Sequence, residues 1–168
     1  MTLSNVELLD WRHRLQGFSC GKPSLDSWLH FATSNQQRGF TRTFVVCDDD
    51  RVIGYYGLAP TVIEPNVVSR KIRTGRPPDP IPCLLIGQLA VDSSYKGKGI
   101  GSALVKDALL RCVAGADFVG GRAIVVRAID EEAERFWQSW DFMPSRDNSS
   151  IRIRSLEDIR AWLSGLDG

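Results

Sequence analysis

The feature of this sequence that most restricts its fold is a glycine-rich turn between an apolar run and a helical pattern. The turn lies within residues 89–102 and contains Gly97, Gly99 and Gly101. Glycine adopts positive φ angles at little cost and lets a ligand approach the main chain closely. The first amides of a helix lack partners inside the helix, and with the helix dipole they form an anion site. The sequence therefore predicts a strand, a diphosphate-binding turn and a helix in succession.

The spacing of these glycines decides which phosphate-bearing ligand the turn suits. A P-loop reads GxxxxGK[ST] and a dinucleotide-binding turn reads GxGxxG, whereas here every second residue from Gly97 to Gly101 is glycine. Neither motif matches this spacing. A glycine-rich helix start without a ligand is the alternative, but the position of the turn directly after the apolar residues 83–91 favours the diphosphate.

The rest of the chain predicts alternating strands and helices. Helices are expected over residues 24–37, 102–113, 131–140 and 156–163, and strands over residues 43–47, 52–58, 83–91, 123–128 and 151–154. Ser24 is the expected N-cap of the first helix and Gly39 its stop. Residues 48–50 are all aspartate and predict a hairpin turn, while the proline-rich residues 60–82 predict a long loop. This order predicts an α/β (α+β) chain with helices packed on a mixed sheet.

The glycine turn resembles the pyrophosphate loop of GNAT acetyltransferases, [QR]xxGx[GA], with Lys96, Gly99 and Gly101 in its first, fourth and sixth positions. Residues 128–142 resemble the strand and helix of that family's second half, A-x-x-F-Y-x-x-x-G-F. Upstream segments resemble one subgroup, the toxins of type II toxin–antitoxin pairs that acetylate aminoacyl-tRNA. These segments are residues 18–20, 25–29, 42–45, 54–59, 80–82 and 89–92. The resemblance implies one GNAT domain over residues 1–168, whose mixed central sheet has splayed middle strands and flanking helices.

The resemblance also implies acetyl-CoA as the cofactor. The backbone of Leu89, Ala90 and Val91 would pair with pantetheine like an added strand, and the amide near Val91 would face the thioester oxygen. The implied cofactor contacts are Leu89, Ala90, Val91, Lys96, Gly97, Lys98, Gly99, Ile100, Gly101, Ser102, Asp130, Ala133 and Phe136.

One position departs from the family pattern where chemistry is expected. Trp137 stands where the family has a tyrosine that protonates the leaving thiolate, and Asp141 replaces the later glycine. An indole N–H donates hydrogen bonds but is no proton source at neutral pH. General acid catalysis contributes about 10²–10⁴-fold, so we expect a slowed enzyme or one that uses Tyr55, Tyr56 or Tyr95 as the acid. Core packing is the alternative role of Trp137.

The charge of the chain is informative only locally. A net charge of +1 gives no general reason to expect nucleic acid binding. Four basic residues nevertheless fall within seven positions: Arg70, Lys71, Arg73 and Arg76. Such a cluster suits phosphates, with a solvated loop as the alternative, and the resemblance favours contact between this cluster and RNA.

Neither a metal site nor a membrane-spanning segment is expected. The cysteines (Cys20, Cys47, Cys83 and Cys112) and the two histidines (His13 and His30) lack metal-ligand spacing. We expect the thiols to be free. No apolar run approaches the ~18–20 residues of a membrane span, and residues 1–10 lack the signal-peptide pattern, so a cytoplasmic location is expected.

The resemblance implies a toxin that transfers acetyl from acetyl-CoA to the α-amino group of aminoacyl-tRNA and so blocks translation. It further implies a ribbon-helix-helix antitoxin as a partner and a homodimer. An α-amino group has a pKa of about 7.7–8.0, against about 10.4 for lysine, so it is deprotonated more easily and needs no strong base. This suits a sequence that shows no His–carboxylate pair to act as one. Two alternatives stay open: acetylation of a small amine or protein N-terminus, and a degenerate acyl-CoA-binding protein without turnover.

Overall fold

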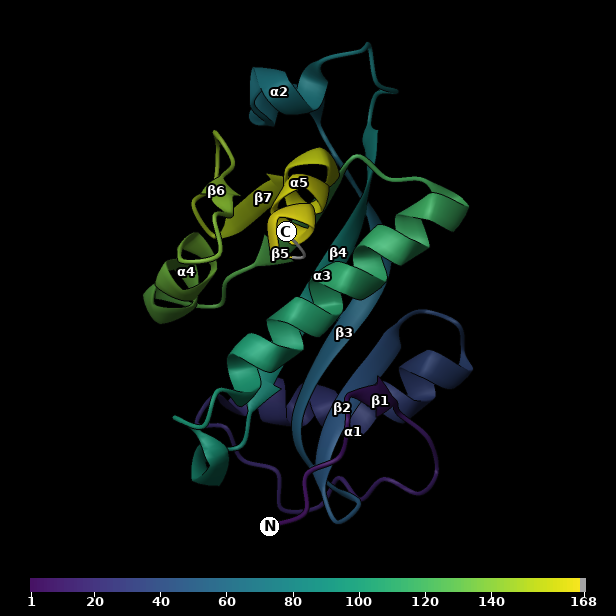
Figure 1. Ribbon diagram of the computed structural model, residues 1–168, viewed down its shortest axis with the longest axis vertical. Coiled ribbons are helices and arrows are strands. Elements are labelled where there is room, and N and C mark those ends of the chain that lie inside the picture. Colours follow the sequence, from purple (N-terminus) through teal and green to yellow (C-terminus); the bar gives the residue numbers. More distant parts are fainter. Residues whose placement is uncertain (167–168) are drawn as a thin grey trace. The chain divides into compact units, whose positions relative to one another are not determined.

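The computed structural model describes residues 1–166, which carry five helices, two short 3-10 turns and seven strands (Figure 1). The strands are β1 (Glu7–Leu8), β2 (Arg42–Asp48), β3 (Arg51–Ile63), β4 (Ile81–Val91), β5 (Ala123–Arg127), β6 (Met143–Pro144) and β7 (Ile151–Ser155). The helices are α1 (Pro23–Gln37), α2 (Arg70–Arg73), α3 (Ile100–Val119), α4 (Glu131–Gln138) and α5 (Leu156–Leu166), and the 3-10 turns are η1 (Pro65–Val67) and η2 (Ser93–Tyr95).

The strands form one sheet in the order β1-β2-β3-β4-β5-β7-β6. Its pairing is mixed, because β4 and β5 run parallel while β2–β3 and β5–β7 run antiparallel. The predicted mixed sheet with helices is confirmed. The chain divides into two compact units, the first made of Met1–Ala59 and Gly87–Ala108 and the second of Pro60–Ile86 and the chain from Leu109 onward. None of the described helices is long and apolar enough to cross a membrane.

The first unit is organised by the hairpin of β2 and β3 and by α1. Asp49 and Asp50 form the turn with φ angles of 50° and 69°, as a tight hairpin turn requires. α1 begins at Pro23 with Lys22 as its N-cap. The prediction of Ser24 as the cap is therefore wrong, because the fixed φ of proline suits the first helical position. The predicted stop is confirmed, since Gly39 follows the helix with φ of 81°.

One glycine of β3 allows the close packing of this unit. A Cβ at Gly57 would lie 2.9 Å from the Trp28 ring. Because glycine has no Cβ, Trp28 of α1 can stack on Tyr55 of β3, with ring centroids 5.6 Å apart and an interplanar angle of 2°. Tyr55 is fully buried, so this stack joins the helix to the sheet in the core of the first unit.

The second unit surrounds the parallel pair of β4 and β5. Leu84–Ile86 pair with Ile124–Val126, and β5 pairs on its other side with β7, which also carries β6. α5 packs against β5 and β7. The core of this unit consists of Ile63, Val68, Ile72, Ile81, Cys83, Ala123, Val125 and Ile153.

Residues 60–82 are not the long loop that the sequence predicts. β3 continues to Ile63, η1 and α2 follow, and β4 begins at Ile81. The prolines of the segment suggest irregular structure, but Val68 and Ile72 between them are buried in the core. Burial of these apolar side chains folds the segment back onto its own unit.

The remaining differences concern the ends of elements. α3 is longer than the predicted 102–113. The prediction leaves Gly101 and Gly115 outside the helix, but both lie inside it, since a helical glycine costs only about 1 kcal/mol. α5 also continues past residue 163, whereas α4 ends at Gln138. β1 and β6 were not predicted, because strands of two residues show no alternation of apolar and polar side chains.

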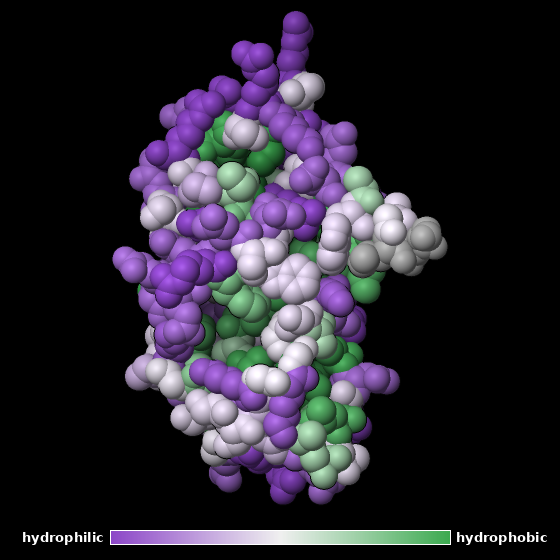
Figure 2. Space-filling view, turned by 60° about the vertical axis from the view of Figure 1, so that its left-hand side comes forward, coloured by the Kyte–Doolittle hydropathy of each residue, from purple (hydrophilic) through white to green (hydrophobic). Residues whose placement is uncertain are grey.

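Side chains divide as expected between core and surface. The four cysteines are free and buried, which confirms the prediction of free thiols. Figure 2 shows one face on which hydrophilic side chains predominate and apolar ones lie between them. Two large apolar side chains are 90% exposed, Trp11 in the first unit and Phe118 in the second.

Candidate functional site

The turn after β4 is fixed by one buried carboxylate in the first unit. Asp92 is 3% exposed, and its two oxygens accept hydrogen bonds from the amides of Ser94 (2.9 Å) and Ser19 (3.1 Å). Its own amide donates to the Ile53 carbonyl at 2.8 Å. The backbone that leads into the glycines is therefore held from three directions.

The glycines that follow leave open space beside the main chain. Gly97 and Gly99 have φ angles of 77° and 79°, and a Cβ at either would meet no atom within 4 Å. At Gly101 it would meet only a Val91 methyl group, at 3.9 Å. Positive φ explains why glycine is needed at the first two positions. The open space beside all three positions fits a ligand in contact with the backbone.

The start of α3 offers unpaired amides to that space. Its first backbone hydrogen bond runs from Ala103 to the Gly99 carbonyl at 3.1 Å. The preceding amides, those of Ile100, Gly101 and Ser102, have no acceptor within the helix, as at every helix start. No acidic residue lies in the first turn of α3, so nothing there opposes an anion.

Lys96 makes a contact that the sequence does not reveal. Its ammonium group donates a hydrogen bond to the Cys20 carbonyl at 2.7 Å and so ties the turn to the segment before α1. A contact of Lys96 with a diphosphate stays a prediction. Lys98 and Ser102 are exposed beside the same turn.

The predicted pantetheine-binding residues lie at the end of β4. In the second unit the pairing of β4 with β5 ends at Ile86, but the strand stays extended to Val91. Ala90 is buried, while Leu89 and Val91 are partly exposed. An extended backbone beyond the end of a ladder suits the strand-like pairing that the prediction requires.

The predicted residues of α4 belong to the second unit. Asp130 is the N-cap of the helix and accepts a hydrogen bond from the Ala133 amide at 2.9 Å. Trp137 is 5% exposed and lies edge-on to Phe136 and Phe142, with ring centroids 5.3 and 5.2 Å away. These contacts support a packing role for Trp137.

The structure divides the predicted basic cluster. Arg70 and Lys71 line a cavity in the second unit, and the Lys71 ammonium donates to Asp158, whose pKa this hydrogen bond lowers. Arg73 is partly buried, and Arg76 is exposed with φ of 55°. Contact between these four residues and RNA stays a prediction.

Comparison with known proteins identifies the family. A family described as "Acetyltransferase (GNAT) domain" matches residues 39–144, which is more than half of the chain. The chain belongs to the GNAT acetyltransferases. It is also 41% identical, over 87% of its length and 88% of the relative, to the "tRNA-acetylating toxin" of Mycobacterium tuberculosis (strain ATCC 25618 / H37Rv). The glycine turn thus lies in an acetyltransferase, and the family confirms the GNAT fold.

Solved structures of GNAT toxins are similar over nearly the whole chain. "AtaT complexed with acetyl-methionyl-tRNAfMet" has a TM-score of 0.87 and 26% identity, covering 96% of this chain and 99% of that one. The "crystal structure of AtaTR bound with AcCoA" has a TM-score of 0.83 and 27% identity, covering 96% of this chain and 98% of that one. The strands and helices described above therefore follow the arrangement of these toxins from one end of the chain to the other.

No tyrosine of this GNAT chain replaces the missing general acid without losing a hydrogen bond of the fold. Tyr55, Tyr56 and Tyr95 are its only tyrosines. The hydroxyl of Tyr55 donates to the Leu25 carbonyl at 2.7 Å, and burial raises its pKa. Tyr56 donates to Asp107. Tyr95 donates to Asp48, and this hydrogen bond raises the pKa of Tyr95.

One cluster of possible metal ligands was missed by the sequence reasoning. Glu7, His13 and Cys47 bring one ligand atom each within 4.8 Å of one another. Hydrogen bonds account for this cluster: His13 Nδ1 accepts from the Asp10 amide (2.9 Å), which leaves the proton on Nε2 to be donated to Glu7 (2.8 Å). Burial raises the pKa of Cys47 to about 12. A protonated imidazole nitrogen and a neutral thiol are poor ligands.

Proposed function

We propose that this GNAT acetyltransferase is a toxin that transfers the acetyl group of acetyl-CoA to the α-amino group of aminoacyl-tRNA and so blocks translation. The observation that carries the proposal is the glycine turn, whose open amides at the start of α3 suit the diphosphate of coenzyme A. The relatives described above supply the acceptor, since they acetylate tRNA or are bound to acetylated tRNA.

The proposed cofactor site uses backbone more than side chains. The amides of Gly97, Gly99 and Gly101, with those of Lys98, Ile100 and Ser102, would hold the diphosphate, and Lys96 would contribute a positive charge. Leu89, Ala90 and Val91 would pair with pantetheine, and the amide near Val91 would donate to the thioester oxygen. Asp130, Ala133 and Phe136 of α4 are the further cofactor contacts that we propose. When bound, acetyl-CoA supplies an activated acetyl group as a thioester.

The proposed acceptor explains how the reaction proceeds without a dedicated base. An α-amino group has a pKa of about 7.7–8.0, so a substantial fraction is neutral near pH 7 and attacks the thioester directly. Water would take the proton that the amine loses on acetylation. Positioning of the two substrates and hydrogen bonding to the oxyanion then supply the acceleration.

In this proposal no side chain of the protein would donate a proton to the thiol of coenzyme A. The indole of Trp137 cannot supply a proton, and the three tyrosine hydroxyls donate elsewhere. A thiol with a pKa of about 8.5 is a tolerable leaving group. We therefore infer a slow transferase rather than an inactive one.

Trp137 also favours a second candidate function. Its burial between Phe136 and Phe142 suits an acyl-CoA-binding protein that has lost turnover. That candidate predicts cofactor binding without product. Acetylation of a small amine or a protein N-terminus has no such observation in its favour.

The partners of the toxin are part of the proposal. We infer a ribbon-helix-helix antitoxin, a cytoplasmic location and a single GNAT domain over residues 1–168 that includes both units. We also infer a homodimer, and the exposed rings of Trp11 and Phe118 support it, because exposed apolar side chains are candidates for burial in an interface. Light scattering of the purified protein tests the dimer.

A single-turnover assay tests the function. The protein is mixed with radiolabelled acetyl-CoA and a panel of aminoacyl-tRNAs, and acetylated product is counted. Product on aminoacyl-tRNA but not on uncharged tRNA supports the toxin. Cofactor binding by calorimetry without product on any acceptor supports the second candidate, and absence of cofactor binding contradicts both.

A further inference from the structure

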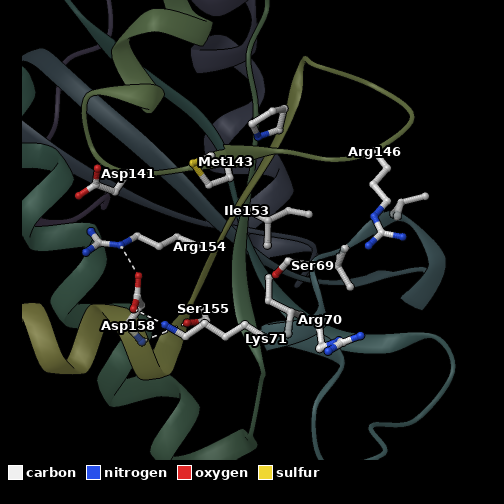
Figure 3. Close-up of a pocket in the computed structure, with 14 residues that line it drawn as sticks. Ser69, Arg70, Lys71, Asp141, Met143, Arg146, Ile153, Arg154, Ser155 and Asp158 are labelled. Atoms are coloured by element: carbon white, nitrogen blue, oxygen red, sulfur yellow. Dashed lines mark hydrogen bonds and ion pairs between the residues drawn. The ribbon is translucent and has the colours of Figure 1, made fainter.

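We propose that the cavity in the second unit binds a nucleotide of the RNA substrate, with Arg70 and Arg146 holding its phosphate. This inference rests on the proposed function, because it names the part of the protein that receives that RNA. The cavity has a volume of about 410 Å³, which is within the usual range for small-ligand sites. Its walls come from residues 67–72, 141–146 and 153–158 (Figure 3).

The walls of the cavity are held in place before any ligand arrives. The Arg146 amide donates to the Val67 carbonyl at 3.0 Å, which fixes two of the three segments to each other. Arg154 is 6% exposed, and its guanidinium donates to the Trp140 carbonyl at 3.1 Å. A ligand site with fixed walls loses little conformational entropy on binding.

The charges around the cavity are unbalanced. Its basic side chains are Arg70, Lys71, Arg146 and Arg154, and its carboxylates are Asp141 and Asp158. Asp158 accepts a hydrogen bond from Lys71 and lies 3.9 Å from Arg154. Within residues 1–166, Arg70 and Arg146 form no side-chain hydrogen bond or ion pair. Figure 3 shows these two on one side of Ile153 and the Lys71–Asp158–Arg154 group on the other.

A buried donor in the same cavity also lacks an acceptor. The Nε atom of Arg154 is inaccessible to solvent and has no hydrogen-bond partner among the described residues. The Asp158 oxygen at 3.9 Å is beyond hydrogen-bond reach. Buried donors are normally satisfied, but an atom closed to solvent is closed to a ligand as well, so the assignment of a ligand depends on Arg70 and Arg146 rather than on this atom.

The remaining lining favours a nucleotide over a bare phosphate. Val68, Ile72 and Ile153 are buried apolar residues of the lining, and Met143 and Pro144 are exposed at its rim. Apolar lining with a few placed charges is typical of organic ligands. The planar guanidinium group matches phosphate oxygens in pairs, while the apolar residues would contact the sugar or base.

An acidic peptide is the other anion that such a cavity suggests, and the sheet argues against it. One way for an extended peptide to bind is by pairing with an edge strand, and a peptide held by the arginines alone is an outcome of the test below. β6 is the last strand of the sheet, but it has two residues, and one of them, Pro144, has no amide to donate. RNA is therefore the ligand we assign.

The test measures RNA binding by the full chain and a matched pair of variants. The double variant Arg70→Gln/Arg146→Gln removes both free charges. Arg160→Gln removes one charge from the same unit outside the cavity, where Arg160 pairs with Asp117 at the surface. Fluorescence anisotropy follows a labelled RNA hairpin with a single-stranded 3′ tail over a range of salt concentrations, and calorimetry follows acetyl-CoA.

We expect the double variant to bind the hairpin about 10- to 100-fold more weakly. Loss of contact with this one phosphate should also reduce the slope of log K against log salt by about 0.7. Arg160→Gln should stay within about 2-fold of wild type, and acetyl-CoA affinity should be unchanged in both. Met143→Ala should weaken binding of the tailed hairpin but not of a hairpin without the tail.

The outcomes separate this inference from the proposed function. If the wild-type chain does not bind the hairpin, the cavity assignment is overturned, while the single-turnover assay on aminoacyl-tRNA decides the proposed function separately. If wild type binds the hairpin and the double variant binds it equally well, only the cavity assignment is overturned. The same anisotropy titrations with a labelled acidic peptide test the other anion: if the double variant loses peptide binding while RNA binding is intact, the cavity belongs to a protein partner and the RNA assignment is overturned.

Discussion

The two units of this GNAT chain use different parts of the polypeptide for their proposed tasks. In the first unit, the glycine turn presents backbone amides, and its glycines contribute by having no side chain that would fill the space beside them. In the second unit, Trp137 and the arginines of the cavity act through their side chains, which come from segments far apart in the sequence. A backbone site can be predicted from the spacing of glycines in the sequence. A site built from distant side chains can be found only in the folded structure.

The largest expected effect lies in the backbone site. Gly99→Val places a branched side chain in the open space beside the turn, and we expect acetyl-CoA binding to weaken about 100-fold or more, which corresponds to about 2.7 kcal/mol. Gly39→Val is the matched control, because Gly39 also has positive φ and open surroundings. Both variants should lose about 1–2 kcal/mol of stability, but calorimetry should find unchanged cofactor affinity only in Gly39→Val. Equal affinities of the two variants for acetyl-CoA would contradict binding of the diphosphate at the turn.

The next effect concerns the side-chain site on α4. Trp137→Tyr supplies a hydroxyl where the family has its proton donor, and we expect the single-turnover rate to rise about 10²-fold. Trp137→Phe is the control, since it shortens the side chain without adding a proton source. A rate that stays level or falls in Trp137→Tyr would mean that packing, rather than chemistry, selects the tryptophan.

A third experiment separates structure from chemistry in the first unit. Tyr55→Phe removes the hydrogen bond from the buried Tyr55 hydroxyl to the Leu25 carbonyl, and we expect the free energy of unfolding to fall by about 0.5–1.5 kcal/mol. The single-turnover rate of the folded variant should be unchanged. A reduced rate in a variant that is fully folded would make Tyr55 a candidate acid again.

The smallest effect lies at the cavity rim. The hydrogen bond from Lys71 lowers the pKa of Asp158 in the folded state, so the pair stabilises the protein above the unfolded pKa of about 3.9 and loses that contribution as pH falls through the folded pKa. Both side chains are about half exposed. Lys71→Gln should therefore lower the unfolding free energy by only about 0.2–1 kcal/mol at pH 7. Chemical denaturation should find this difference shrinking towards zero in acid, and a difference that grows in acid would contradict the ion pair.

This contrast also explains what could be predicted from the sequence. The longer strands and helices and the glycine turn were predictable, because periodicity and glycine spacing are local, whereas the short elements β1, β6 and α2 were not. Residues 60–82 were misjudged, since their prolines are visible in the sequence but the burial of Val68 and Ile72 is not. Arg146 and Arg154 gave no signal, because only the fold brings them to the same cavity as Arg70.

The buried cysteines give the protein a built-in signal of its own unfolding. Burial raises the pKa values of Cys83 and Cys112 to about 11 and about 12, and the thiolate is the form that reacts. The native chain should thus stay silent towards a chromogenic thiol reagent. Coenzyme A released by acetyl transfer would be the first thiol to react, so colour could report turnover continuously, and a later rise in colour would mark denaturation.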